Sequence, residues 1–209
     1  DKEGRDRTAV CCLSSLNVEK YDEWKDDKNF IGDVMRFLDN VLSDFINKAP
    51  EQFKDAKYSA ERERSVGLGV MGFHSFLQQK RIPLESVMAK SWNKKIFKNI
   101  HEKVNQASKD LAEERGACPD AAEYGFKERF SNKTAIAPTA SISIICGGAS
   151  PGVEPIAANS YTHKTLSGSF NVRNRYLEEI LESHGKNDDE TWSTITTNQG
   201  SVSHLDFLT

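Results

Sequence analysis

The sequence has few cysteines, and none of them has a metal-binding spacing. It holds four cysteines in 209 residues, too few for the disulfide scaffold of a small secreted domain. Two of them, Cys11 and Cys12, are adjacent, and a bond between neighbouring cysteines would close a strained ring. No Cys-x-x-Cys pair and no His-Glu-x-x-His motif occurs, which argues against a structural or catalytic zinc site. Any chemistry of the cysteines is therefore expected to be redox chemistry.

Excess charge and long apolar runs are also lacking. A formal net charge of −3 and an isoelectric point near 6.0 indicate no basic patch for nucleic acid or for an anionic membrane. No apolar run approaches the length that crosses a bilayer, and no leader-like pattern opens the sequence. We therefore expect a cytoplasmic protein that binds neither nucleic acid nor membrane. A content of 37% hydrophobic and 28% charged residues is typical of a globular protein.

Two apolar segments near the start predict a strand followed by a helix. Residues 8–16 (TAVCCLSSL) are small and apolar with charge on either side, which is typical of a strand buried on both faces. Because side chains alternate along a strand, Cys11 and Cys12 are expected on opposite faces. In residues 31–48, apolar positions recur at helical spacing, and Asp39 falls on the polar side. This second segment therefore predicts an amphipathic helix.

The rest of the chain mixes helix and strand patterns. An apolar stripe that starts at Leu84 predicts a long core helix capped by Gly116, whereas the charged residues 51–64 are expected to form a surface connection. Further predicted elements are β-structure in 160–172, with a turn at Ser167-Gly168, and an amphipathic helix at 176–184. No repeat and no linker is evident. Residues 1–209 are therefore expected to form a single domain, which is incomplete.

Three glycines have the Gly-x-Gly-x-x-Gly spacing of a dinucleotide-binding turn. They are Gly67, Gly69 and Gly72. A dinucleotide-binding turn follows a buried strand, but the charged residues 61–64 precede this one, and no acidic residue closes a second strand about 20 positions further on. We interpret the glycines instead as places where a short strand and a helix pack closely. The alternative is a nicotinamide-dependent dehydrogenase, which would bind NADH.

A strand followed by a loop of small and hydroxylated residues is predicted in 134–155 (TAIAPTASISIICGGASPGVEP). The apolar residues 135–137 end at Pro138. From Thr139 to Ser143 the side chains are mostly small or hydroxylated, so backbone N–H groups can approach an anion, and a helix beginning here would add its positive end. We expect an anion at this loop. The alternative is a purely structural turn, because Ser/Thr-rich turns are common after strands.

Five segments of the chain, in this order, resemble the large, catalytic subunit of class I ribonucleotide reductases. They are AVCCLSSLNV, VGLGVMGF, AKSWNKKIFKNIHEKVNQASKDLAEERGACP, APTASISIICGGASPGVEP and SYTHKTLSGSFNVRN. The resemblance extends over nearly the whole chain. It implies an α/β fold in which this chain supplies the C-terminal part of a ten-stranded α/β barrel. Ribonucleotide reductases reduce ribonucleotides at the 2′ position by a radical mechanism, which provides deoxyribonucleotides for DNA synthesis.

The resemblance implies roles for individual residues. Cys11 matches one of two cysteines that supply electrons and become a disulfide; its partner would lie outside this chain. Cys12 matches a position that is not restricted to cysteine and is expected to be a small buried hydrophobe. Cys118 and Cys146 do not match the partner position and are expected to be buried structural residues. The substrate phosphates are expected to bind Pro138, Thr139, Ala140, Ser141 and Ile142, through backbone N–H groups and hydroxyls.

The resemblance also implies partners. No metal and no cofactor is expected on this chain, because a metal-containing small subunit supplies the radical and nucleotide effectors bind elsewhere. Expected partners are the N-terminal part of the large subunit, the small subunit, a ribonucleoside diphosphate, and thioredoxin or glutaredoxin as external reductant. The Asn-x-Cys-x-Glu motif of the radical cysteine does not occur in this sequence. The chain is therefore expected to be inactive alone.

Two further alternatives stay open. One is a non-catalytic assembly module whose free barrel edges bind the missing half. The other is a fragment of a cobalamin-dependent (class II) reductase, because similar phosphate loops occur in that class. Turnover by this chain alone would contradict the main hypothesis, and a gain of mass without activity on mixing with the missing half would favour the module.

Overall fold

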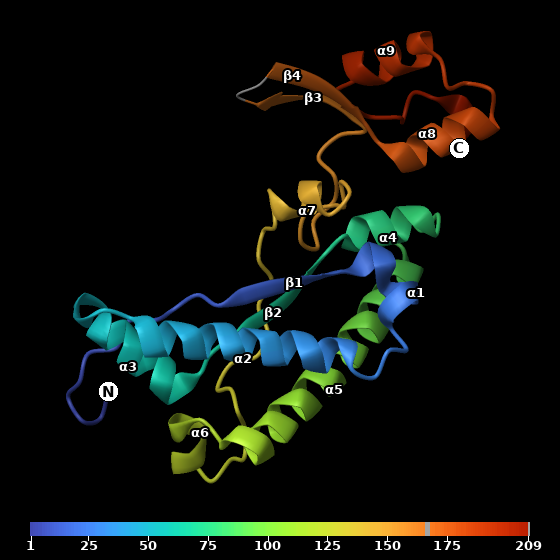
Figure 1. Ribbon diagram of the computed structural model, residues 1–209. Helices are drawn as coiled ribbons and strands as arrows, with labels where there is room; N and C mark the ends of the chain where they lie inside the picture. The colour runs from blue at the N-terminus through green and yellow to red at the C-terminus, as the bar shows by residue number, and fades with distance from the viewer. Residues whose placement is uncertain (166–167, 209) are drawn as a thin grey trace. The chain divides into compact units, whose positions relative to one another are not determined.

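The chain folds into two compact units. The computed structural model describes residues 1–165 and 168–208, and the chain divides into Asp1–Glu154 and Pro155–Thr209 (Figure 1). Each unit has its own cluster of buried apolar side chains. That residues 1–209 form a single incomplete domain stays a prediction, since two units of one chain can belong to one larger domain.

A small parallel sheet lies in the first unit. Strands β1 (Leu13–Asn17) and β2 (Gly67–Met71) pair in parallel, and Leu68 forms a parallel bridge to Thr134 on the other edge of β2. The strand predicted over residues 8–16 is wrong for its first half. Leu13 is paired with Gly67, which is the first residue of β2. The residues before Leu13 therefore have no strand residue opposite them in this sheet.

The strand predicted after Thr134 is also shorter than expected. Thr134 forms the bridge to Leu68, and the residues after it, 135–137, form no ladder. The reason lies at the end of β2, where the backbone N–H of Gly72 donates to the carbonyl of Ser150 at 2.7 Å. The loop that follows the short strand therefore folds back on the end of β2 instead of extending the sheet.

Two long helices pack on one face of the sheet. These are α2 (Phe30–Lys48) and α5 (Val87–Arg115), and both predicted helices are confirmed. The predicted cap is confirmed as well, since Gly116 ends α5 with a φ of 88°. The core between the helices and the sheet contains Leu16, Leu68, Val70, Ile31, Met35, Leu38, Leu42, Ile96, Ile100, Val104 and Leu111.

The residues predicted to be a surface connection form helix α3 (Lys54–Glu63). The prediction was wrong because charge dominates the outer side of this helix, while Ala56, Tyr58 and Ala60 are buried. The helix ends at Arg64 in the left-handed region, with a φ of 45°.

Asp39 is not on the polar side of α2, as its spacing predicted, but fully buried. Its carboxylate accepts hydrogen bonds from Arg64, Arg115 and Arg129. These arginines lie 25, 76 and 90 positions away in the sequence. The helical pattern of α2 alone therefore gave no sign of them.

Short helices connect the main elements. They are the 3-10 helices η1 (Val18–Lys20) and η2 (Glu51–Phe53), and the α-helices α1 (Tyr21–Trp24), α4 (Phe73–Gln79), α6 (Pro119–Glu123) and α7 (Ile142–Ile145). Helix α4 follows β2 directly, and α7 begins within the loop that is predicted to bind phosphate. A helix therefore begins in this loop, as the sequence suggested, but it is only four residues long.

The second unit contains a hairpin and two short helices. Strands β3 (Ser160–Thr165) and β4 (Gly168–Arg173) pair in antiparallel fashion, so the predicted β-structure is confirmed. Ser167 of the predicted turn lies outside the described residues. The predicted helix is confirmed as α8 (Arg175–Ser183). It packs on α9 (Asp189–Thr197), in a part of the chain without a clear pattern, and η3 (Asp206–Leu208) follows.

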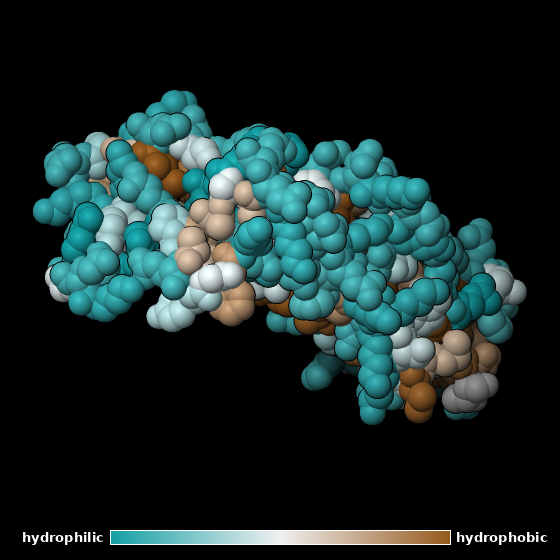
Figure 2. Space-filling model, turned by 90° about the horizontal axis from the view of Figure 1, so that it is seen from below, coloured by the Kyte–Doolittle hydropathy of each residue, from teal (hydrophilic) through white to brown (hydrophobic). Residues whose placement is uncertain are grey.

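The surface has a mixed character. Most of the face drawn in Figure 2 is hydrophilic, and hydrophobic residues reach it in small groups. Exposed apolar side chains include Phe37 and Val41 on α2 and Ile144 and Ile145 on α7. Among the described helices, none combines the length and the apolar character that a bilayer crossing requires.

Candidate active site

The loop predicted to bind phosphate is held in a strained shape. Thr139 has a φ of 53°, which is rare for a β-branched residue, and it is buried although its neighbours are exposed. Its Oγ1 accepts a hydrogen bond from the backbone N–H of Gly152 at 2.7 Å, and its carbonyl accepts one from the N–H of Ser143 at 3.0 Å. Two later segments of the chain thus fix the backbone of Thr139.

Three consecutive backbone N–H groups of this loop have no hydrogen-bond acceptor among the described residues. The N–H groups of Ala140, Ser141 and Ile142 make no hydrogen bond with any described residue, and all three residues are exposed. They belong to the bend that leads into α7, where N–H groups lack helical partners. Such a run of free donors fits an anion with several oxygens, such as a phosphate group.

Two buried serines anchor the far side of the loop. The N–H of Ser75 in α4 donates to Oγ of Ser150 at 3.1 Å, and the N–H of Ser150 donates to Oγ of Ser75 at 2.9 Å. Gly72, at the start of α4, donates its N–H to the carbonyl of Ser150 at 2.7 Å. The turn after α7 is therefore fastened to the β2–α4 corner by three hydrogen bonds.

Cys11 lies just before β1 and its side chain is exposed. The neighbouring side chains of Val10 and Cys12 pack against the core under the helices. Because side chains alternate along an extended chain, Cys11 belongs to the series that turns away from this core, together with Leu13. Cys11 and Cys12 lie before the strand begins, so their placement on opposite faces stays a prediction, although their exposures differ.

The two parts of the candidate site lie toward opposite ends of the paired segments. Ser14 and Thr134 are both paired with Leu68, on opposite sides of it. Cys11 lies three residues before Ser14, and Thr139 lies five residues after Thr134. Eight extended residues span about 26 Å along a strand, and β2 lies between the two segments that carry Cys11 and Thr139. A ligand that touches both would have to lie along the strands.

The comparisons with known proteins agree with each other. The family model for the ribonucleotide reductase barrel domain matches residues 2–127 and 120–209. The ribonucleoside-diphosphate reductase large subunit of Invertebrate iridescent virus 6 is 52% identical over 201 residues, which are 95% of this chain and 21% of that protein. The solved structure of the class Id ribonucleotide reductase alpha subunit of Actinobacillus ureae matches with a TM-score of 0.88 and 40% identity, over 98% of this chain and 37% of that one.

This chain belongs to the ribonucleotide reductase barrel-domain family. It spans about a fifth to a third of the length of the curated reductases that it matches first. The predicted α/β fold class of the reductase barrel is confirmed by the family model and by the structural match. A vitamin B12-dependent reductase of Thermoplasma acidophilum is 38% identical over 76% of this chain. Since that similarity is lower and covers less, the class II alternative is not favoured.

The other cysteines of this reductase-family chain differ in burial. Cys118 is fully buried, as predicted, and burial raises the pKa of its thiol. Cys12 is half-buried; burial, and then the neighbouring Cys11, raise its pKa. The prediction that Cys146 is buried is wrong. This residue ends α7 and is followed by Gly147 and Gly148, both with positive φ, and the chain turns there in an exposed loop.

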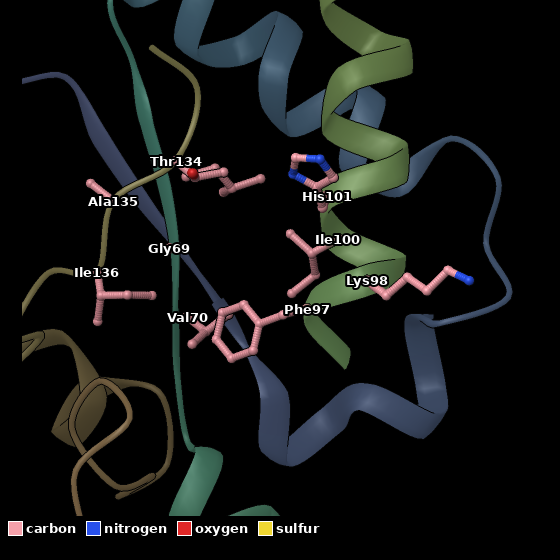
Figure 3. Close-up of a pocket in the computed structure, with 10 residues that line it drawn as sticks. Gly69, Val70, Phe97, Lys98, Ile100, His101, Thr134, Ala135 and Ile136 are labelled. Atoms are coloured by element: carbon pink, nitrogen blue, oxygen red, sulfur yellow. The ribbon is translucent and has the colours of Figure 1, made fainter. Parts of the chain in front are cut away.

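Both edges of the sheet border an apolar groove. The β1 groove, of about 670 Å³, is lined by Cys11, Phe37, Val41, Phe45 and Phe53 among others. The α5 groove, of about 640 Å³, lies between α5, β2 and the Thr134 segment. Figure 3 shows Phe97 and Ile100 pointing from α5 toward β2, whereas Lys98 points away. Among the described residues, no further strand pairs with the outer edge of β1 or of the Thr134 segment.

The glycines of the dinucleotide-like spacing allow close packing, but not between a strand and a helix as interpreted from the sequence. A Cβ on Gly69 would lie 2.1 Å from the carbonyl oxygen of Ala135, and a Cβ on Gly72 would lie 2.6 Å from Oδ1 of Asn17. The close neighbours are the adjacent strand segment and the end of β1 rather than a helix. These glycines therefore serve contacts inside the fold.

Sequence reasoning missed Ser75 and Ser150. Each is a common residue in a short polar stretch, and they are 75 positions apart, so no local pattern connects them. Among the described residues, no group of three His, Cys, Asp or Glu side chains is arranged to hold a metal ion.

Proposed function

We propose that this chain is part of the catalytic large subunit of a ribonucleoside-diphosphate reductase. Within that subunit it contributes the loop that binds the substrate diphosphate and one thiol of the reductant pair. The observation that carries this proposal is the run of three exposed, unpaired N–H groups in the loop, at a position that matches the family's phosphate loop. Membership of the reductase family supports it.

In this proposal the diphosphate lies on the loop formed by Pro138, Thr139, Ala140, Ser141 and Ile142. The N–H groups of Ala140, Ser141 and Ile142 donate to phosphate oxygens, so the side chains at these positions can vary. The ribose then extends along the strands toward Cys11. Because Cys11 is exposed, its sulfur is open to a substrate and to a second thiol.

The proposed role of Cys11 is to supply electrons. For each ribonucleotide, Cys11 and a partner cysteine outside this chain lose two electrons and two protons and form a disulfide. The 2′ hydroxyl leaves as water, and a C–H bond forms at the 2′ carbon. A third cysteine, also outside this chain, carries the radical that starts the reaction, and a metal-containing small subunit generates that radical. Thioredoxin or glutaredoxin would then reduce the disulfide.

The proposed partner for the open edges is the N-terminal part of the same subunit. The free edges of β1 and of the Thr134 segment each lie beside an apolar groove, and an uncovered sheet edge is a ready site for pairing with another segment. This feature also suits the assembly-module alternative, in which the chain binds the missing part but contributes no reacting group. We expect cytoplasmic activity for the assembled enzyme.

The test compares the reductase activity of residues 1–209 alone with that of a mixture of residues 1–209, the remainder of the large subunit and the small subunit. Residues 1–209 are expected to show no reduction of a ribonucleoside diphosphate alone. Mixing with the remainder of the large subunit and the small subunit should restore turnover, and Cys11→Ser in the mixture should abolish it. Turnover by residues 1–209 alone would refute the proposal. If the Cys11→Ser chain still assembles with the missing part and the mixture stays active, the reductant role of Cys11 is refuted and the assembly role remains.

A further inference from the structure

We propose that Ser75 and Ser150 are positioning residues for the phosphate loop. Their mutual hydrogen bonds fasten the turn after α7 to α4 and thereby keep the loop in the shape that leaves its three N–H groups free. The inference rests on the proposed function, since it takes the loop to be the diphosphate site. It adds two residues outside the loop that set substrate affinity without touching the substrate.

The two serines form a buried, mutually hydrogen-bonded pair. Both are almost completely buried, with exposures of 0% for Ser75 and 1% for Ser150. Each hydroxyl oxygen accepts the other residue's backbone N–H. Removing either hydroxyl therefore leaves a buried N–H group without its partner, which is more costly than losing an exposed hydrogen bond.

A short path leads from this pair to the loop. Gly152 follows Ser150 by two positions, and its N–H donates to Oγ1 of Thr139 at 2.7 Å. Gly152 is buried, and a Cβ there would lie 3.2 Å from the carbonyl oxygen of Ala137, so the turn packs directly against the start of the loop. A shift of the turn at Ser150 would therefore be passed to Thr139.

The backbone conformation of Thr139 explains why the loop needs the Ser75–Ser150 contacts. A β-branched residue at a φ of 53° is strained, and strained backbone persists only where its surroundings fix it. The fixing contacts are those of Gly152 and Ser143. If the turn were released, Thr139 would relax to negative φ, and the N–H groups that follow it would change direction.

A third buried serine offers a matched control. Ser108 in α5 is also fully buried, and its Oγ accepts the backbone N–H of Arg129 at 3.1 Å. As at Ser75 and Ser150, the hydroxyl oxygen accepts a backbone N–H, but here the carbonyl of Ser108 also accepts the same N–H, at 3.2 Å. The bond joins α5 to the segment before residue 130, away from the loop. Ser108→Ala thus measures what the loss of one buried acceptor does to the fold alone.

The experiment uses the full-length large subunit with its small subunit. We measure KM and kcat for a ribonucleoside diphosphate and the inhibition constant of inorganic pyrophosphate. Loss of one such hydrogen bond corresponds to about a tenfold change in an equilibrium constant. Ser75→Ala and Ser150→Ala should therefore raise KM and the pyrophosphate constant about tenfold with little change in kcat. The double variant should resemble either single variant, because both break one clamp.

Ser75→Cys provides a milder variant, which keeps the packing and weakens only the acceptor. It should raise KM in the same direction by a smaller factor. Ser108→Ala should lower the unfolding temperature but leave both constants unchanged. The inference is overturned if the variants of Ser75 and Ser150 affect only the unfolding temperature, as Ser108→Ala does.

A loop variant separates this inference from the proposed function. Ser141→Asp places a carboxylate among the three free N–H groups and should raise KM sharply if diphosphate binds there. If Ser141→Asp raises KM and the serine variants do not, the clamp is refuted and the phosphate site stands. If Ser141→Asp changes neither KM nor pyrophosphate inhibition, the proposed phosphate site itself is refuted.

Discussion

The guanidinium group of Arg129 donates to both carboxylate oxygens of Asp39, at 2.8 and 3.2 Å. Arg64 and Arg115 donate to the same carboxylate, so one buried acid joins α2 to the end of α3, to the end of α5 and to the segment before the Thr134 bridge. This acid therefore ties the two long helices to the segment that leads into the loop, and it lies in neither part of the candidate site.

Asp39→Asn is expected to destabilise the protein strongly. It leaves three arginines around a neutral amide, and breaking a buried ion pair costs about 3–5 kcal/mol of unfolding free energy. Urea unfolding measures the loss. The matched control on the same helix is Asp44→Asn, whose ion pair with Lys48 is exposed, and it should change the unfolding free energy little. Equal effects of the two variants would contradict the central role of Asp39.

The contribution of Asp39 should depend on pH in a defined direction. Burial alone would raise its pKa, but the hydrogen bonds and charges of Arg129, Arg64 and Arg115 outweigh burial and hold the pKa below its ordinary value. A carboxyl with a lowered folded pKa contributes fully above its unfolded pKa of about 3.9 and loses the contribution as pH falls through the folded value. The stability gap between wild type and Asp39→Asn should be constant above about pH 5 and shrink below about pH 4. A gap that grows on acidification would contradict this.

Thr139→Ala should weaken substrate binding, whereas Thr139→Ser should not. Alanine removes the acceptor of the Gly152 N–H and leaves a buried donor unpaired, which costs about 1–3 kcal/mol. Serine keeps the hydroxyl. KM for a ribonucleoside diphosphate, measured on the assembled enzyme, distinguishes the two variants. If both raise KM equally, the hydroxyl contact is not what holds the loop.

Two glycine variants test the close approach of β2 to its neighbour. Gly69→Ala places a Cβ 2.1 Å from the carbonyl oxygen of Ala135 and should destabilise the fold by about 1–3 kcal/mol through overpacking. Gly32→Ala, inside α2 with open space around its Cβ, should stabilise it by up to about 1 kcal/mol. Thermal unfolding measures both. NADH fluorescence should show no binding to wild type; tight binding lost in a bulky Gly69 variant would restore the dinucleotide interpretation.

Thiol labelling should distinguish the cysteines of residues 1–209. Cys146 is exposed, whereas Cys118 is fully buried with a pKa raised by burial, and alkylation needs an accessible thiolate. Iodoacetamide at pH 8 should therefore label Cys146 well before Cys118, as read by peptide mass spectrometry. In urea the two should react alike. Labelling of native Cys118 as fast as Cys146 would contradict the described burial.

The sequence predicted those helices and strands whose own residues show a clear apolar periodicity or β-type composition. Helices α2, α5 and α8 have apolar positions at helical spacing, and the hairpin has β-type composition, so local periodicity was sufficient. Helix α3 was missed because small and polar residues such as Ala56 and Ser59 form its buried side. The strand at Thr134 was overestimated because its length depends on what β2 pairs with.

For the candidate site, the loop and the thiol named from the sequence stay predictions, and no sequence pattern indicated the contacts that hold the loop. A run of small residues after an apolar segment indicates free N–H groups, and these are present. The bonds of Thr139 to Gly152 and of Ser75 to Ser150 join positions 13 and 75 apart. Such pairs arise only when the chain folds, and single-sequence patterns do not contain them.

The most direct test of the central claim is a single turnover of the fully reduced enzyme without external reductant. The cysteines are then mapped by peptide mass spectrometry. The account predicts that Cys11 forms a disulfide with a cysteine outside residues 1–209, in an amount equal to the deoxyribonucleotide produced, while Cys12, Cys118 and Cys146 remain thiols. Product formation with Cys11 still reduced, or with another of these cysteines oxidised in its place, would contradict it.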